Sequence, residues 1–172
     1  MSAAESASAE SANAKRAKTR ANARIDPRGP RFGAGITAVL LLVVVFLGLI
    51  GLTTAATVLL GVLALLFLWG ATAGIARHPW GLVFKTFVRP RLNPPADLED
   101  RTPPTFAQGV GFVITALGVV LQLVGVPYAA VVGAALAFVA AFLNSVFGYC
   151  LGCQIYLLLV RSGLVGRSQP QA

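Results

Sequence analysis

The sequence has few charged side chains, and acidic ones are especially scarce. Only 12% of its 172 residues are charged, six are Asp or Glu, and 56% are hydrophobic. A water-soluble domain could not expose so apolar a composition without aggregating. The scarcity of charge therefore excludes a soluble globular protein. It indicates a membrane protein whose first partner is the lipid bilayer.

Charge is absent altogether from two long stretches, residues 32–76 and 106–160. Each is too long for one membrane span of about 20 residues, so each predicts two helices. The breaks are expected at the Gly- and Thr-containing residues 51–54 and at residues 125–127, which contain a proline. The expected spans are 33–50, 55–75, 106–123 and 128–147. Without an ionisable side chain, these spans argue against a proton-driven pump.

The basic residues all lie outside the expected spans. They are Lys15, Arg16, Lys18, Arg20, Arg24, Arg28, Arg31, Arg77, Lys85, Arg89, Arg91, Arg101, Arg161 and Arg167. Basic residues concentrate on the cytoplasmic side of membrane proteins. The pattern therefore predicts a multi-pass protein of the bacterial inner (plasma) membrane, with both termini and the loop 77–105 in the cytoplasm. No nucleic-acid motif accompanies the basic residues, so no nucleic-acid partner is expected.

The chain divides into a membrane domain and two tails. Residues 1–24 are rich in Ala, Ser and basic residues, which is typical of a disordered basic tail. Residues 25–165 form the expected four-span domain, and residues 166–172 form a second disordered tail. The fold class predicted is an all-α membrane protein with a short interfacial helix in the central loop and a short C-terminal helix.

An offset of 74 residues aligns the two halves of the chain. It places Phe32 on Phe106, Gly51 on Gly125, and Gly74 on Gly148. Such a match predicts a pseudo-repeat of two helical hairpins in the same orientation, facing each other in the membrane.

The central loop contains an amphipathic segment, PWGLVFKTFVRPRL. If the segment is helical, Trp80, Phe84 and Phe87 share a face that suits the headgroup region of the membrane. The basic Arg89 and Arg91 complete a surface that could also dock a partner protein.

Gln122 and Asn144 lie inside the expected spans, and Gln108 lies at the entry of the third span. Intramembrane amides usually form hydrogen bonds between helices. The alternative is a polar path between the halves, in which Asn144 leads toward the cysteines.

The chain has only two cysteines, Cys150 and Cys153, in the segment FGYCLGCQIY. Two thiols supply half of a tetrahedral metal site. The single histidine, His78, could add a ligand, but a histidine before a proline at a helix end is usually interfacial. No metal and no cofactor are therefore expected. Metal binding is the least favoured of three interpretations. The other two are that the cysteines are small residues packed between helices and that they form a reactive dithiol.

A reactive pair would have defined roles. At the cytoplasmic face the cysteines should rest as thiols, because structural disulfides are rare there. Cys150 would attack and Cys153 would resolve the mixed disulfide. One pair is too few for a disulfide relay across the membrane.

The backbone around the pair decides between these interpretations. One helix over residues 128–160 would be about 50 Å long, well beyond a hydrocarbon core of about 30 Å. A break near Gly148 and a new helix from about Cys150 are therefore predicted. The first turn of that helix would direct backbone amides at the sulfur and favour the thiolate.

Three segments carry a resemblance to a known family: DPRGPRF, HPWGLVFKTFVRPRLNPPADLEDRTPPTFAQG and FGYCLGCQIYLLL. They resemble the bacterial family known as domain of unknown function 4395, over about residues 25–160. The resemblance implies a membrane location and an association with thioredoxin-like and sulfur-transfer proteins.

The function expected is thiol–disulfide or sulfur-transfer chemistry by a cytoplasmic-face dithiol, with a soluble thioredoxin-like or sulfurtransferase partner. One alternative is a non-catalytic membrane anchor or subunit whose cysteines only pack. Another is a channel for small reduced sulfur compounds. Whether the protein is an enzyme, and its oligomeric state, stay open at this stage.

Overall fold

The computed structural model describes residues 24–95 and 97–164. Four long helices dominate it, α2 (Arg28–Leu49), α3 (Thr53–Ala73), α5 (Thr102–Leu123) and α6 (Ala129–Phe147). The central loop holds the helical segments η1 (Ile75–Arg77), α4 (Pro79–Val83), η2 (Phe84–Val88) and η3 (Arg89–Arg91). A shorter helix, α7 (Leu151–Arg161), ends the described chain. The tails predicted to be disordered lie outside the described residues, except Arg24.

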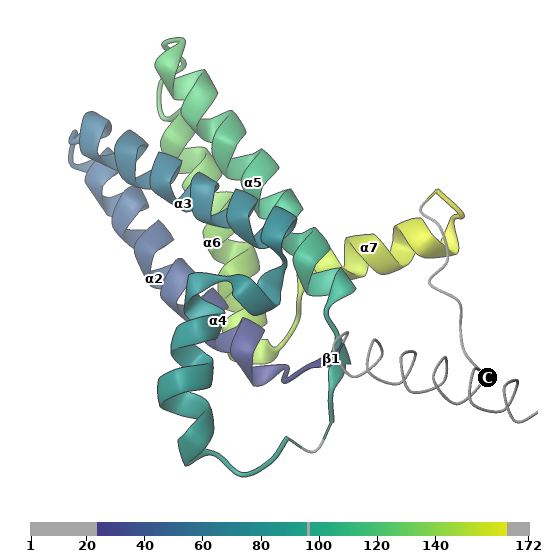
Figure 1. Cartoon of the computed structure of the whole chain (residues 1–172). Helices are drawn as coiled ribbons and strands as arrows, with labels where there is room; N and C mark the ends of the chain where they lie inside the picture. Colours follow the sequence, from purple (N-terminus) through teal and green to yellow (C-terminus); the bar gives the residue numbers. More distant parts are fainter. Residues whose placement is uncertain (1–23, 96, 165–172) are drawn as a thin grey trace, which may run out of the picture.

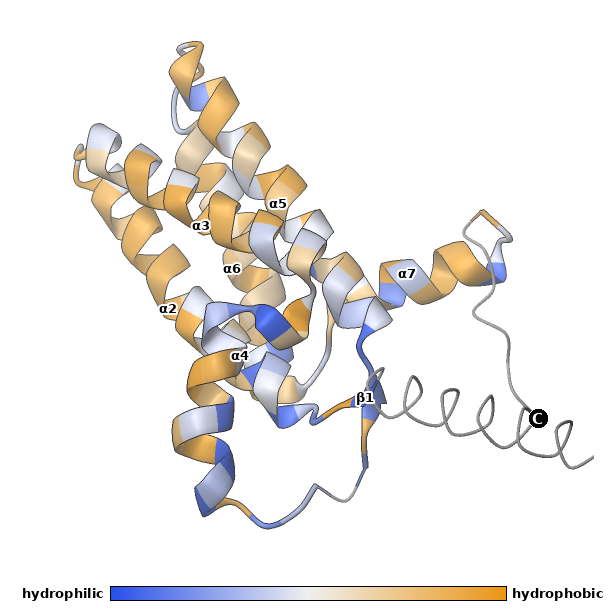
Figure 2. Cartoon of the chain, in the orientation of Figure 1, coloured by the Kyte–Doolittle hydropathy of each residue, from blue (hydrophilic) through white to orange (hydrophobic). Residues whose placement is uncertain are grey.

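The four long helices are long and apolar enough to cross a membrane, which identifies the chain as a membrane protein. Figure 2 shows hydrophobic colouring over most of these helices, interrupted by paler turns. Large apolar side chains such as Val39, Phe46 and Leu65 are more than 60% exposed on the bundle, as expected where lipid covers the surface. Four long apolar helices are present as predicted, and α2 and α5 begin earlier than the spans that the sequence suggested.

The bundle is built by contacts between helices from different halves of the chain. Helix α2 packs most extensively on α6, and α3 packs most extensively on α5. Short turns at residues 50–52 and 124–128 connect α2 to α3 and α5 to α6 at one end of the bundle (Figure 1). We call this the turn end, and the opposite end, with the central loop and α7, the loop end. Helices α2 and α5 therefore begin at the loop end, and helices α3 and α6 end there.

The buried apolar core lies in the half of the bundle next to the turn end. Leu41, Val44, Leu60 and Leu63 are at most 1% exposed and form one cluster with alanines of α6. Gly48 allows close approach here, because a Cβ at this position would overlap the side chain of Val131. The turn half of the bundle is therefore a solid core.

Helix bounds in the two halves recur at the offset found in the sequence. Helix α2 begins at Arg28 and ends at Leu49, and α5 begins at Thr102 and ends at Leu123. The matching glycines, Gly51 and Gly125, both adopt positive φ angles, +87° and +92°. These local features agree with the pseudo-repeat, which itself stays a prediction.

The loop end is held together by short polar contacts. Strand β1 (Arg24–Ile25) pairs antiparallel with β2 (Glu99–Asp100), a pairing that the sequence did not predict. The buried carboxylate of Asp26 accepts hydrogen bonds from the backbone and side chain of Arg28 at 3.0 Å. Burial opposes ionisation of Asp26, but these hydrogen bonds outweigh it and lower its pKa. The strand pairing joins the chain before α2 to the central loop, and the Asp26–Arg28 contacts hold the first turn of α2.

The predicted break after the fourth span is confirmed. Helix α6 ends at Phe147, and Gly148 adopts a left-handed conformation with φ +67°. The N–H of Gly148 donates to the carbonyl of Asn144 at 3.1 Å, which is the hydrogen bond of an αL cap, and the N–H of Tyr149 donates to the carbonyl of Leu143 at 3.2 Å. Helix α7 then begins at Leu151 and runs away from the bundle (Figure 1).

Candidate functional site

A cavity of about 750 Å³ occupies the loop half of the bundle. Its walls come from β1, the four long helices, the central loop and the first residues of α7. This volume is typical of a small-molecule site. Its residues nearest the turn end include Thr37 and Ile114, and the solid core lies beyond them. The cavity therefore ends inside the bundle.

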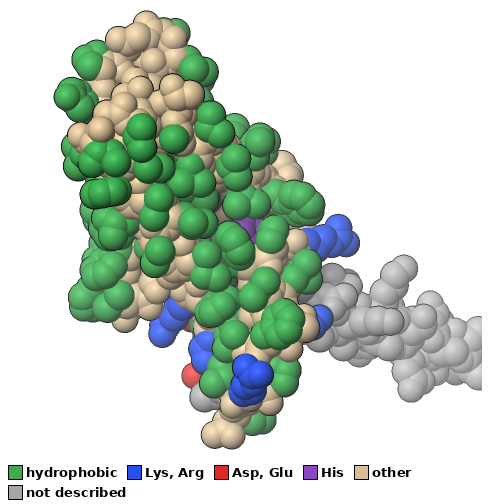
Figure 3. All heavy atoms as spheres, turned by 90° about the vertical axis from the view of Figure 1, so that its left-hand side faces the viewer, with side chains coloured by type: hydrophobic (Ala, Val, Ile, Leu, Met, Phe, Trp, Pro, Cys, Tyr) green, Lys and Arg blue, Asp and Glu red, His purple; other side chains and the backbone are tan. Residues whose placement is uncertain are grey.

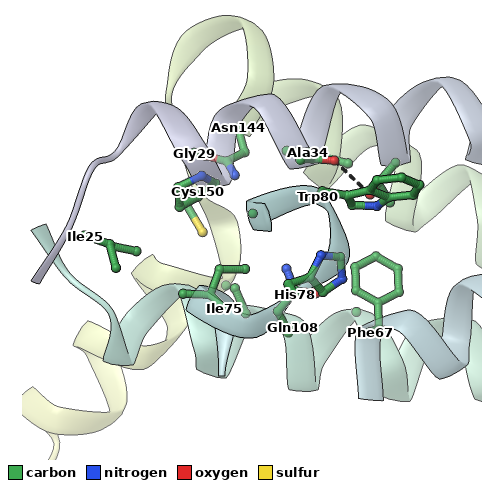
Figure 4. A pocket seen from close by; sticks show the side chains of 18 of the residues that line it. Ile25, Gly29, Ala34, Phe67, Ile75, His78, Trp80, Gln108, Asn144 and Cys150 are labelled. Atoms are coloured by element: carbon green, nitrogen blue, oxygen red, sulfur yellow. Dashed lines mark hydrogen bonds between the residues drawn. The ribbon is translucent and has the colours of Figure 1, made fainter. Parts of the chain in front are cut away.

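Cys150 lies in the wall of this cavity, and Cys153 is not among the lining residues. Figure 4 shows the Cys150 sulfur directed into the space between Asn144 on one side and Ile75 and Gln108 on the other. The two cysteines form a close pair at disulfide distance, with their Cα atoms 5.2 Å apart. The structure thus places the two sulfurs close enough to form a disulfide with each other.

Cys150 caps the N-terminus of α7. Its Sγ accepts a hydrogen bond from the backbone N–H of Cys153 at 3.3 Å. A helix N-terminus carries partial positive charge and unpaired amides, which stabilise a thiolate relative to a thiol. The local backbone is therefore the one that the reactive interpretation of the pair requires.

Two close contacts fix the position of the Cys150 segment. Gly152 packs against α5 so tightly that a Cβ would lie 2.7 Å from the Cα of Ala107. On the other side of Cys150, the guanidinium of Arg31 occupies the space where a Cβ of Gly148 would stand. Glycine on each side of Cys150 therefore lets neighbouring helices approach the start of α7.

His78 is the histidine of the cavity wall and is 4% exposed. Gly74, with φ +84°, reverses the chain after α3 and returns His78 toward the bundle. The sequence favoured an interfacial position for His78, but the structure buries it beside α3. Burial lowers the pKa of His78, and a hydrogen bond with the backbone of Leu66 offsets this only in part. The imidazole is thus neutral at pH 7.

This burial predicts a pH-dependent stability. In the unfolded chain His78 binds a proton below about pH 6.5, whereas in the folded chain burial keeps the imidazole neutral to lower pH. The free energy of unfolding should therefore fall as the pH drops from 6.5 to 5. The slope should be at most about 1.4 kcal/mol per pH unit. Denaturation in detergent micelles measures it. His78→Gln should flatten the slope, and an unchanged slope would contradict the burial of a neutral imidazole.

The three amides near the bundle interior have different surroundings. The Oε1 atom of Gln122 accepts from the N–H of Ala130 at 3.2 Å, which joins α5 to α6 as expected of a structural amide. Asn144 and Gln108 line the cavity instead. In the part of the chain that the structure describes, neither of these two side chains has a hydrogen-bond partner. Both amides are therefore free to bind a ligand.

The aromatic side chains of the central loop do not share one exposed face. Phe84 is 5% exposed and its ring packs on Phe32, and Trp80 lies against Gly33. Phe87 is 62% exposed, so it alone suits the predicted membrane interface. Trp80 and Phe84 line the cavity, as does Arg89. Arg91 is exposed and lies outside the lining.

The sequence carries no clear signal for which side chains of the long helices line the cavity. Helices that are apolar on every side give no periodicity to show which face meets a cavity. Gln108 and His78 were visible as polar residues at span ends. The offset of 74 did place His78 level with Gly152, and both residues do line the cavity.

The family model described as Domain of unknown function (DUF4395) matches residues 25–161. No curated protein and no solved structure matches the chain. The matched segment includes every helix from α2 to α7 and the whole cavity wall except Arg24.

Proposed function

The chain belongs to the DUF4395 family, and we propose that its cysteine pair is a dithiol–disulfide couple that exchanges electrons with a soluble partner. The observation that carries this proposal is the placement of Cys150, whose sulfur caps α7 and faces the cavity. A thiol in this position is favoured as a thiolate, which is the nucleophile in disulfide exchange.

The proposed exchange has two steps that balance. The Cys150 thiolate attacks a disulfide RS–SR, forming a bond between Cys150 and one sulfur and releasing RS⁻, which takes a proton from water. Cys153 then loses its proton to water, and its thiolate attacks the Cys150 sulfur and releases the second RS⁻. Two electrons pass from the pair to the substrate, and the Cys150–Cys153 disulfide remains. A reduced soluble partner reverses both steps.

The membrane orientation proposed places the loop end in the cytoplasm. Support comes from the basic residues, because Arg77, Lys85, Arg89 and Arg101 all lie in the central loop at that end. Figure 3 shows Lys and Arg side chains gathered toward the lower part of the molecule, below a broad hydrophobic surface. Cys150 would then meet the reducing compartment, where a reactive pair cycles between thiol and disulfide.

The two alternative functions, a channel and a non-catalytic anchor, require other structural features. A channel for reduced sulfur compounds needs a path through the bundle, and the fully buried Leu41, Leu60 and Leu63 lie between the cavity and the turn end. An anchor whose cysteines only pack does not need a sulfur in a cavity wall. The cavity with Cys150 in its wall therefore favours the exchange reaction over both alternatives.

The proposal is tested with glutathione disulfide and single-cysteine variants. Reduced Cys153→Ser protein should accumulate a stable mixed disulfide between Cys150 and glutathione, since the resolving thiol is gone. Mass spectrometry of the intact protein detects it. Cys150→Ser should form this adduct at least about tenfold more slowly, because Cys153 is not the N-cap residue of α7 and does not line the cavity. Equal rates for the two variants would refute the assigned roles, and no adduct in either would refute the exchange.

A further inference from the structure

The Cys150 sulfur lies inside the wall of the cavity, which limits what can reach it. The neighbouring lining residues Leu151 and Gly152 begin α7, and Gly152 is buried against α5. Facing the sulfur are side chains of the central loop and α5, among them Ile75 and Gln108 (Figure 4). A disulfide on the surface of a folded protein would have to enter this space, whereas a small molecule fits in about 750 Å³.

The cavity wall at the loop end has an excess of positive charge. The charged residues lining the cavity are Arg24, Lys85, Arg89 and Arg101 against the single carboxylate of Asp26. Asp26 is already paired with Arg28 at 3.0 Å, the only ion pair among the described residues. None of the four cations is within salt-bridge distance of a described carboxylate, and Arg89 interacts with Asp26 only at longer range. Clefts lined by one sign of charge raise the local concentration of oppositely charged ligands.

Farther inside, the polar groups of the cavity are uncharged. The amides of Asn144 and Gln108 line it and have no partner among the described residues. Each amide carries two N–H donors that can bind a carboxylate oxygen or a sulfur atom. The remaining wall is largely apolar, with Phe67, Ala137 and Ile114 at its inner end. The cavity thus combines cations at the loop end, free amide donors near the sulfur, and an apolar end.

We propose that the substrate of Cys150 is a low-molecular-weight anionic disulfide, drawn in by the cations of the central loop and held by Asn144 and Gln108. This inference rests on the proposed exchange reaction and names the substrate class. The anionic groups meet Lys85 and Arg89 while the S–S bond lies at the Cys150 sulfur. The reduced pair gives two electrons to the substrate, which leaves as two anionic thiols, and the pair becomes the disulfide.

Three disulfides of similar size and different charge test the inference. They are 3,3′-dithiodipropionate, a dianion; bis(2-hydroxyethyl) disulfide, which is neutral; and cystamine, a dication. Each reacts with the reduced full-length protein in a neutral detergent, and each rate is divided by its rate with a short cysteine peptide. The dianion should react fastest and the dication slowest, with about a tenfold ratio at low salt that shrinks at high salt.

Variants show whether the central-loop cations cause the preference. The double change Lys85→Gln with Arg89→Gln should reduce the dianion-to-dication ratio at least about threefold. Arg77→Gln is the matched control, because Arg77 is an exposed cation of the same loop that lies outside the cavity lining. It should leave the ratio unchanged. An equal loss in the control would show a general charge effect and overturn the assignment to the cavity.

The outcomes separate this inference from the proposed function. If the three disulfides react equally after normalisation, or the neutral one reacts fastest, the anionic substrate is wrong although Cys150 is still reactive. An oxidised thioredoxin-like protein that reacts as fast as the dianion would overturn the small size of the substrate. If no disulfide reacts with the reduced protein, the exchange function itself is wrong.

Discussion

Gly152→Ala should destabilise the protein by about 1–3 kcal/mol and release the start of α7 from α5. A Cβ at this position would stand 2.5 Å from the Cβ of Ala107 and 2.7 Å from its Cα. The Cα belongs to the backbone of a long helix, so it cannot move aside as a flexible side chain would. The loss should occur although alanine is the better helix former by about 1 kcal/mol.

The free energy of unfolding in detergent micelles measures the effect of Gly152→Ala. Two further variants test whether the overlap with Ala107 causes it. Gly61→Ala is the control, because Gly61 lies inside α3 with open space around it; stability should stay the same or rise. Ala107→Gly in the Gly152→Ala background removes one of the two overlapping atoms and should recover part of the loss. A fully stable Gly152→Ala protein would mean that α7 does not pack on α5 as described.

Gly148→Ala should have the second large effect, on the reactivity of Cys150. Gly148 ends α6 with φ +67°, a conformation that costs an alanine roughly 1–2 kcal/mol. The new Cβ would also displace the guanidinium of Arg31. Without this cap, α6 can continue toward Cys150, whose sulfur would then lie near a helix C-terminus instead of an N-terminus. Thiolate formation is disfavoured there.

The pH dependence of alkylation by iodoacetamide reports this change in the Cys153→Ser background. Gly148→Ala should move the midpoint of the Cys150 alkylation curve to higher pH. Gly163→Ala is the matched control, because Gly163 also has a positive φ, +77°, but lies in open space beyond α7. It should leave the midpoint unchanged. The same midpoint in the Gly148→Ala protein would show that the turn does not activate Cys150.

Much of the fold could be predicted because membrane insertion imposes simple rules. Stretches free of charge gave the spans, and glycine or proline at residues 51 and 127 gave the turns. The break at Gly148 followed from length alone, since one helix to residue 160 would exceed the membrane thickness. The start of a helix at the cysteines followed from the break. These predictions depend on the thickness of the bilayer and on local backbone preferences, and both can be applied to a single sequence.

The cavity could not be predicted in the same way. It depends on which faces of four apolar helices meet, and residues such as Ala137 and Leu136 look alike in the sequence whether they face lipid or cavity. The burial of His78 depends on the reversal at Gly74, whose positive φ is known only from the structure. The approach of Gly152 to Ala107 joins residues far apart in the chain. Each is a tertiary contact without a local sequence signal.

The most direct test of this account is the alkylation midpoint of Cys150 in the reduced Cys153→Ser protein, measured with iodoacetamide across the pH range. A helix N-terminus that stabilises the thiolate predicts a midpoint clearly below the value of about 8.5 for an ordinary cysteine. It also predicts a midpoint below that of Cys153 in the Cys150→Ser protein. A Cys150 midpoint at or above about 8.5 would contradict the account, because the pair would then be a packed structural element and not an exchange site.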